Sequence, residues 1–173
     1  DALLKKALEI RPKIIIAGYS SYPWVPDWQK FREIADSAGA LLLTDVSHIA
    51  GLIAAGQIPS PVGFAHVITF TTHKTMIGPR GACIITDNKA FANKIDKAVF
   101  PGEQGGPHIN TIAALALTFK LAQTEEFKGL QKQILLNAVA FSEQLKARGL
   151  RVPYDGTDTH IVLLDCKSVR GQD

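Results

Sequence analysis

The stretch VITFTTHKTMIGPRG, residues Val67–Gly81, decides how the rest of the chain is interpreted. The residues of Val67–Thr71 are apolar, β-branched or aromatic, which predicts a buried strand. The polar residues of Thr72–Thr75 end the strand, and Gly78–Gly81 predicts a tight turn. Lys74 therefore lies just past a buried strand. The charge and pKa of a lysine respond readily to burial, so this position suits Schiff-base chemistry, although a solvated loop lysine fits this segment equally well.

The composition is that of a globular protein with a core of its own. The chain has 173 residues, of which 46% are hydrophobic and 20% are charged. A net charge of +3 with scattered basic residues argues against a nucleic-acid partner. Because there is neither a membrane-length apolar run nor a signal segment, we expect no membrane partner. We expect a cytoplasmic protein, with an organellar one as the alternative. Cys83 and Cys166 follow no metal-ligand pattern, so we expect reduced thiols and no metal site.

The order of the predicted elements favours an α/β fold. Helices and strands alternate at the start of the chain, which is typical of parallel βαβ units. A strand that follows the Gly78–Gly81 turn after so short a connection is expected to be antiparallel to its predecessor. Helices are predicted over Ala2–Ile10, Trp28–Ser37, Ile49–Ala54, Asn88–Ala98, His108–Ala122 and Glu125–Arg148, and strands over Lys13–Ala17, Ala40–Asp45, Val67–Thr71, Ala82–Thr86 and His160–Asp165.

Polar side chains follow the ends of three predicted strands. Ser20 comes after the first strand, Asp45 ends the second and Lys74 follows the third. Ligands bind at this edge of open α/β sheets. A carboxylate at the end of a core strand needs a cation or hydrogen-bond donors, so Asp45 is a candidate site residue, with an N-cap as the alternative. His48 is close enough to share the same site, with an ordinary loop histidine as its alternative.

A glycine-rich loop, Pro101–Pro107, precedes one of the predicted helices. Free amides at a helix N-terminus bind anions, although a plain flexible turn fits this loop as well. The loop is not a Walker A loop, and no GxGxxG dinucleotide pattern occurs. A strand-end lysine, a buried acid and a phosphate-type loop together match the needs of pyridoxal phosphate: a lysine for the Schiff base, an acid that keeps the pyridine nitrogen protonated, and amides for the phosphate.

Five stretches of the chain closely resemble the serine hydroxymethyltransferase family of fold-type-I pyridoxal-phosphate enzymes. They are RPKIIIAGYSSYP (Arg11–Pro23), TDVSHIAGLIAAG (Thr44–Gly56), TTHKTMIGPRG (Thr71–Gly81), VFPGEQGGP (Val99–Pro107) and GTDTH (Gly156–His160). Their order and spacing cover nearly the whole chain, and the lysine motif is highly specific. The chain departs from the usual pattern at Phe70 and Glu103, and neither position carries an assigned chemical role.

The resemblance implies a role for each matching site residue. Lys74 resembles the Schiff-base lysine, Asp45 the partner of the pyridinium nitrogen, and His48 a residue beside the phenolic oxygen, with Ser20 nearby. Further residues in matching positions are Thr71 and His73, which would line the site beside the lysine; Arg80, which would position active-site groups; and Gly105 and Gly106, whose amides would bind the cofactor phosphate across a subunit interface.

The same resemblance implies the fold and the reaction. The expected fold is the three-layer αβα large domain of fold-type-I enzymes over residues 1–151, with a mostly parallel sheet and one antiparallel strand. A C-terminal α+β domain is expected to begin at 152–173. The implied reaction converts L-serine and tetrahydrofolate reversibly into glycine and 5,10-methylenetetrahydrofolate. Pyridoxal phosphate would be covalently bound on Lys74, in a homodimer or dimer of dimers with shared active sites.

Both ends of the chain resemble cuts through a longer protein. In this family, other cofactor contacts and much of the folate pocket lie upstream of Asp1, and the arginine that binds the substrate carboxylate lies downstream of Asp173. We therefore expect the chain alone not to turn over serine. The alternatives are a threonine aldolase-like pyridoxal-phosphate enzyme, against which the lysine motif argues, and a non-catalytic scaffold fragment, which need not bind the cofactor.

Overall fold

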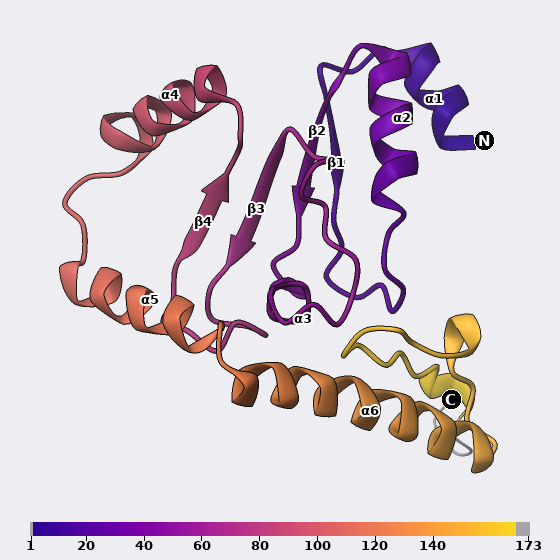
Figure 1. Cartoon of the computed structure of the whole chain (residues 1–173). Coiled ribbons are helices and arrows are strands. Elements are labelled where there is room, and N and C mark those ends of the chain that lie inside the picture. The colour runs from indigo at the N-terminus through magenta and orange to yellow at the C-terminus, as the bar shows by residue number, and fades with distance from the viewer. Residues whose placement is uncertain (1, 169–173) are drawn as a thin grey trace.

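A computed structural model of the chain describes residues 2–168 and contains one four-stranded mixed sheet flanked by helices (Figure 1). The strands lie in the sheet in chain order: β1 (Ile14–Ala17), β2 (Leu41–Asp45), β3 (Val67–Thr71) and β4 (Ala82–Ile85). The first three are parallel, and β4 is antiparallel to β3. This arrangement confirms the α/β fold with one antiparallel strand that the sequence predicted.

The helices follow the expected order. They are α1 (Ala2–Ile10), α2 (Trp28–Ala38), α3 (Ala50–Ala54), α4 (Lys89–Lys97), α5 (Ile109–Leu121) and α6 (Glu125–Ala147), with shorter helical turns at Ala98–Glu103, Pro153–Asp155 and Cys166–Ser168. Asp27 and Asn88 cap α2 and α4 by accepting backbone N–H groups, and both residue types are favoured at this position. Within residues 2–168, none of these helices combines the length and the apolarity that a membrane crossing requires.

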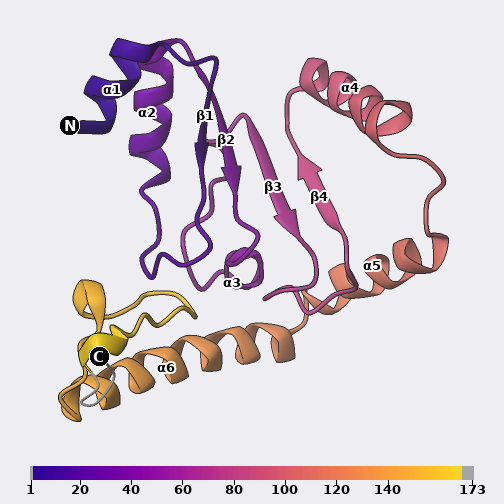
Figure 2. The ribbon, with the colours of Figure 1, turned by 180° about the vertical axis from the view of Figure 1, so that it is seen from behind.

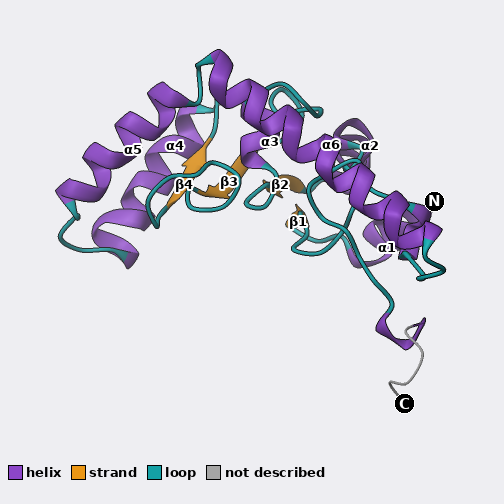
Figure 3. Ribbon diagram, turned by 90° about the horizontal axis from the view of Figure 1, so that it is seen from below, coloured by secondary structure: helices purple, strands orange, loops and turns teal. Residues whose placement is uncertain are grey.

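The two faces of the sheet are packed differently (Figure 3). Alternate residues of a strand point to opposite faces, so Ile15 faces one side and Ile14 and Ile16 face the other. Ile15 is buried, whereas Ile14 and Ile16 are 50% and 69% exposed, and Ile84 of β4 is 44% exposed. The register places these exposed isoleucines on one face. On this face the described part of the chain provides only α4, whose Ile95 lines a hollow with Ala82 and Ile84 of β4, so the face is left uncovered at β1.

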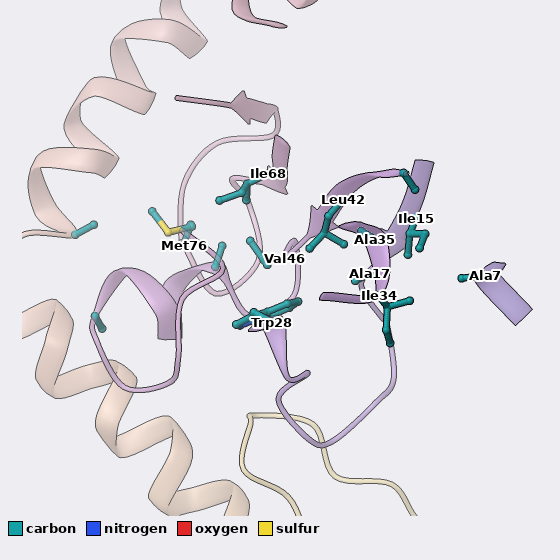
Figure 4. Packing of buried hydrophobic residues seen from close by; sticks show 14 of the residues in the cluster. Ala7, Ile15, Ala17, Trp28, Ile34, Ala35, Leu42, Val46, Ile68 and Met76 are labelled. Carbon is teal, nitrogen blue, oxygen red and sulfur yellow. The ribbon is translucent and has the colours of Figure 1, made fainter. Parts of the chain in front are cut away.

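The core lies between the covered face and α2 (Figure 4). Leu42 of the central strand is fully buried, and Trp28 at the start of α2 is 3% exposed. The Trp28 indole N–H donates to the Pro59 carbonyl at 3.1 Å, so the ring is buried without leaving its polar atom unpaired. Burying a side chain of this size stabilises a fold by roughly 2–3 kcal/mol. This packing fixes β1 and β2, whose ends carry part of the candidate site.

Two sequence predictions near the C-terminus are wrong (Figure 2). The segment His160–Asp165 is not a strand, because no neighbouring strand within residues 2–168 supplies the ladder hydrogen bonds that a strand needs. The buried stripe of α6 also differs from the apolar face that helical spacing predicts, which consists of Phe127, Leu130, Ile134, Leu135, Ala138, Phe141 and Leu145. The buried stripe consists of Phe127, Gln131, Ala138 and Ser142, whereas the apolar residues Leu130 and Phe141 are 47% and 57% exposed. The domain boundary at 151/152 stays a prediction.

Candidate functional site

The carboxyl ends of three parallel strands meet at one edge of the sheet and bring the predicted residues into one region. Gly18 follows β1, Asp45 ends β2, and Lys74 lies three residues beyond β3. A Cβ atom on Gly18 would lie 2.3 Å from the Asp45 carbonyl oxygen, which no side chain could tolerate. Glycine is therefore required there, because it lets the loop after β1 lie directly against Asp45.

Asp45 is held as a carboxylate by neighbouring donors. One carboxylate oxygen accepts the Ser47 backbone N–H at 3.0 Å, and the other accepts the Thr69 hydroxyl at 2.9 Å. Burial raises the pKa of Asp45, but hydrogen bonds from the side chain and backbone of Ser47 and from Thr69, together with the Lys74 charge, outweigh burial and leave the pKa below its usual value. Asp45 does not cap α3, whose N-cap is Ile49. It remains an anion at neutral pH.

His48 shares the site and stays neutral. Its pKa lies below the usual value because it is partly buried and because the Lys74 charge repels a second cation, while the Asp45 charge opposes the shift. The ring stacks on the ring of His160, with centroids 6.1 Å apart and planes inclined by 15°. His48 and Asp45 also line one small cavity of about 10 Å³ with residues of the loop after β1. A neutral imidazole can donate one hydrogen bond and accept another.

Backbone contacts fix the loop that carries Lys74. The buried Thr72 hydroxyl donates to the Pro79 carbonyl at 2.6 Å, and the Gly78 N–H donates to the Thr72 carbonyl at 2.8 Å. Ile77 has a φ of 60°, a left-handed conformation that is strained for a β-branched residue. Its N–H donates to the Lys74 carbonyl at 2.9 Å. The turn thus closes tightly behind the lysine and holds its backbone in place.

Two further contacts anchor this loop from other elements, and sequence reasoning missed both. The Thr75 hydroxyl accepts the Gly51 N–H at 3.0 Å and donates to the His48 carbonyl at 2.8 Å, which joins the loop to the start of α3. The Thr75 carbonyl accepts the side-chain amide of Gln131, a fully buried residue of α6, at 2.8 Å. The sequence offered one signal for the second contact: Gln131 lies between apolar residues of an amphipathic helix, and a buried amide needs a hydrogen-bond partner.

Two predicted residues beside the lysine carry unpaired buried atoms. Thr71 donates its backbone N–H to the Ser47 hydroxyl at 3.1 Å, but its own hydroxyl oxygen has no partner in the described part of the chain. The Nδ1 atom of His73 is likewise buried and unpaired there. Buried polar atoms are normally hydrogen-bonded. Within residues 2–168, the Lys74 amine also forms no hydrogen bond or ion pair, so polar groups remain for a ligand.

The remaining predicted residues lie apart from the group formed by Asp45, His48 and Lys74. Ser20 and Arg80 are exposed, and no hydrogen bond joins either side chain to the other predicted residues within 2–168. Gly105 and Gly106 are exposed in the connection between α4 and α5, which lies far from the ends of β1 and β2 in Figure 1. A Cβ atom at either glycine would meet nothing within 4 Å.

A larger apolar hollow of about 300 Å³ lies elsewhere, between α3 and the end of α5 over β3 and β4. Its lining includes Ile68, Phe70 and Phe119 and contains no titratable side chain. Catalysis of proton or group transfer needs such side chains. The strand-end cluster around Asp45 and Lys74 is therefore the candidate site.

Comparison with known proteins identifies the family of the chain. The family profile described as serine hydroxymethyltransferase matches residues 1–173. The chain belongs to the serine hydroxymethyltransferase family. It is 54% identical to the serine hydroxymethyltransferase of Ehrlichia chaffeensis over 100% of this chain, 52% identical to that of Wolbachia pipientis wMel over 97%, and 51% identical to that of Prochlorococcus marinus over 98%. It spans 42%, 40% and 41% of the lengths of these family members, respectively.

Proposed function

We propose that this chain carries the cofactor-binding core of a pyridoxal-phosphate-dependent serine hydroxymethyltransferase. The observation that carries the proposal is that Lys74, three residues beyond β3, lies at the same edge of the sheet as a carboxylate that is kept ionised at the end of β2. The family membership supports the same reading. The reaction converts serine and tetrahydrofolate into glycine, 5,10-methylenetetrahydrofolate and water, and it is reversible.

The residues of the site fit pyridoxal phosphate. The amine of Lys74 is free of hydrogen bonds within residues 2–168, as attachment to an aldehyde requires. The Asp45 carboxylate matches a protonated pyridine nitrogen in charge and hydrogen bonding. The unpaired buried atoms of Thr71 and His73 offer polar contacts beside the lysine. When bound, the cofactor supplies an electron-withdrawing ring that lowers the barrier to breaking bonds at the substrate carbon.

Each side chain has a distinct task. Lys74 would hold the cofactor through its amine, and the same amine would be available as a base close to the reacting carbon. Asp45 holds a proton on the pyridine nitrogen, because Ser47 and Thr69 keep the carboxylate ionised. His48, neutral at pH 7, supplies a hydrogen bond to the phenolic oxygen. Ser20 and Arg80 would complete the site only with substrate or neighbouring segments in place.

The active site would be shared between two subunits of a homodimer or of a dimer of dimers. Helix α5 carries apolar residues on several sides, yet Ile109, Ile112 and Leu117 are 67%, 51% and 57% exposed. A helix that is apolar all round is normally buried. Covering α5 with a second subunit would place the preceding glycines, Gly105 and Gly106, at the interface, where their amides could bind the partner's cofactor phosphate. We place residues 1–151 in the large domain, 152–173 at the start of the next, and the protein in the cytoplasm.

The test is a titration of the purified chain with pyridoxal phosphate. Formation of the visible absorption band would be followed by borohydride reduction and peptide mapping. We expect the label on Lys74 and its loss in Lys74→Ala, whereas the control Lys94→Ala, which removes an exposed lysine of α4, should retain the label. A label spread over other lysines, or kept in Lys74→Ala, would refute the assignment.

A second measurement concerns turnover. The chain alone is expected not to convert serine to glycine, because it spans only 40–42% of the length of its relatives. Turnover by the 173-residue chain would contradict this expectation. Dependence of that turnover on tetrahydrofolate would separate hydroxymethyl transfer from the aldolase alternative, which needs no folate.

A further inference from the structure

The segment Gly156–His160 is anchored to the loop that follows β1, more than a hundred residues earlier in the chain. The hydroxyls of Thr157 and Thr159 both donate to the Pro23 carbonyl, at 3.0 and 3.1 Å. The Asp158 carboxylate accepts the Val25 N–H at 2.8 Å. Both threonines are buried. Figures 1 and 2 show this C-terminal segment beneath the lower end of the sheet. These hydrogen bonds fix the position of the segment.

The last residue of the anchored segment, His160, lies beside the candidate site. The ring of His160 lies nearly parallel to that of His48, with a plane angle of 15° and centroids 6.1 Å apart. Ile161 lines the same small cavity as Asp45 and His48. The His160 Nδ1 atom is buried and has no hydrogen-bond partner within residues 2–168. The ring therefore has a defined place beside the site but no hydrogen bond there that explains its chemistry.

From this geometry we propose that His160 is a positioning residue for the reaction, which holds the ring of His48 in one orientation and covers one side of it. The inference rests on the proposed function, since it gives His48 the cofactor's phenolic oxygen as a partner. A parallel ring on one side prevents the His48 side chain from tilting away from the ligand. His160 also excludes water from that side, and loss of hydration disfavours the charged form of His48.

The charged and titratable groups around the pair agree with this role. His48 faces Lys74 and Asp45 from the neighbouring strand ends, and His160 faces His48. Burial and the proximity of His48 hold the pKa of His160 below its usual value. Burial and the Lys74 charge do the same for His48. Both rings are therefore neutral at pH 7, so neither adds a positive charge that would compete for the Asp45 carboxylate.

The alternative is that Gly156–His160 only braces the loop at Pro23–Val25, with the histidine incidental. A brace would depend on Thr157, Asp158 and Thr159 but not on the ring of His160. Replacing the ring while keeping the anchors separates the two roles. His160→Ala removes the ring, and His160→Phe keeps a flat ring that cannot be charged.

The experiment is an NMR pH titration of the His48 ring in the purified chain without cofactor, paired with the affinity of the same variants for pyridoxal phosphate. In His160→Ala, we expect the His48 pKa to rise toward its ordinary value of about 6.5. In the same variant, the affinity should fall by about tenfold, which corresponds to about 1.4 kcal/mol. His160→Phe should keep most of the affinity, since the ring remains. His108→Ala, which replaces an exposed histidine before α5, is the control and should change neither quantity.

An unchanged His48 titration in a folded His160→Ala chain would overturn the inference, with folding checked by the backbone amide spectrum. If His160→Ala does not fold, His160→Phe decides: because its ring still covers His48, a raised His48 pKa or a tenfold loss of affinity in this variant overturns the inference. Failure of the proposed function is a separate result, namely no label on Lys74 in the unsubstituted chain. The titration requires no cofactor and can therefore succeed or fail independently.

Discussion

Replacing Gly51 with alanine should destabilise the chain and loosen the loop that carries Lys74. Gly51 is buried in α3, directly against the Thr75 backbone. A Cβ atom there would lie 2.1 Å from the Thr75 carbonyl oxygen and 2.4 Å from its carbonyl carbon. Because the obstacle is backbone rather than the tip of a flexible side chain, the loop or the helix would have to move by about 1 Å.

The size of the effect follows from the contacts at Thr75. Such a displacement strains three hydrogen bonds, those with Gly51, His48 and Gln131. Overpacking typically costs about 1–3 kcal/mol, and each hydrogen bond contributes about 1 kcal/mol. Alanine in a helix regains about 1 kcal/mol relative to glycine. If the three strained hydrogen bonds lose about half of their contribution, the net loss is roughly 2–3 kcal/mol.

Urea unfolding, followed by tryptophan fluorescence, measures this loss. Gly129→Ala in α6 is the matched control, because it makes the same exchange inside a helix where a Cβ atom meets nothing within 4 Å. The control should raise the free energy of unfolding by about 1 kcal/mol and with it the urea midpoint, while Gly51→Ala lowers the midpoint at an unchanged slope. Gly51→Ala should also weaken cofactor labelling of Lys74. A midpoint that rises for both variants would refute the reasoning about the Thr75 contact.

Three other substitutions test the same region. The folded-state pKa of Asp45 is depressed, so its charge stabilises the fold above the unfolded-state pKa of about 4, and this stabilisation is lost as the pH falls through the folded value. The urea midpoint of Asp45→Asn should therefore be lower than that of the unsubstituted chain at pH 7, and the two midpoints should converge in acid. Ile77→Asn should raise the free energy of unfolding by about 1 kcal/mol, because asparagine tolerates a φ of 60°; an unchanged midpoint would contradict strain at this exposed position. Gln131→Leu should lower it by about 1–3 kcal/mol in the same assay, because the buried Thr75 carbonyl loses its donor; a stabilised variant would show that this hydrogen bond is dispensable.

The core of the candidate site was predictable because its signals are local. Lys74 and Asp45 each follow a short run of strand-forming residues, and the ends of parallel strands meet at one edge of a sheet. The N-caps at Asp27 and Asn88 also have local signals, since a cap depends on the residues next to it. Roles of residues such as Ser20 and Arg80 remain predictions that rest on family resemblance.

The residues that hold the site in place lie far apart in sequence. Gln131 reaches Thr75 from a helix 56 residues away, and Thr157 and Thr159 reach Pro23 across 134 and 136 residues. Such contacts carry no local pattern, because threonine and glutamine are common in exposed positions as well. Only the tertiary structure shows which of these distant groups form hydrogen bonds with one another.

The sequence by itself determined the order and type of most elements, the family and the position of the lysine, because short-range periodicity, caps and a specific motif encode them. Tertiary structure decided which face of the sheet is covered, that His160–Asp165 is not a strand, and that His160 lies against His48. Those outcomes depend on which distant backbone and side-chain groups find partners, since hydrogen bonds and packing between separate segments are properties of the folded chain.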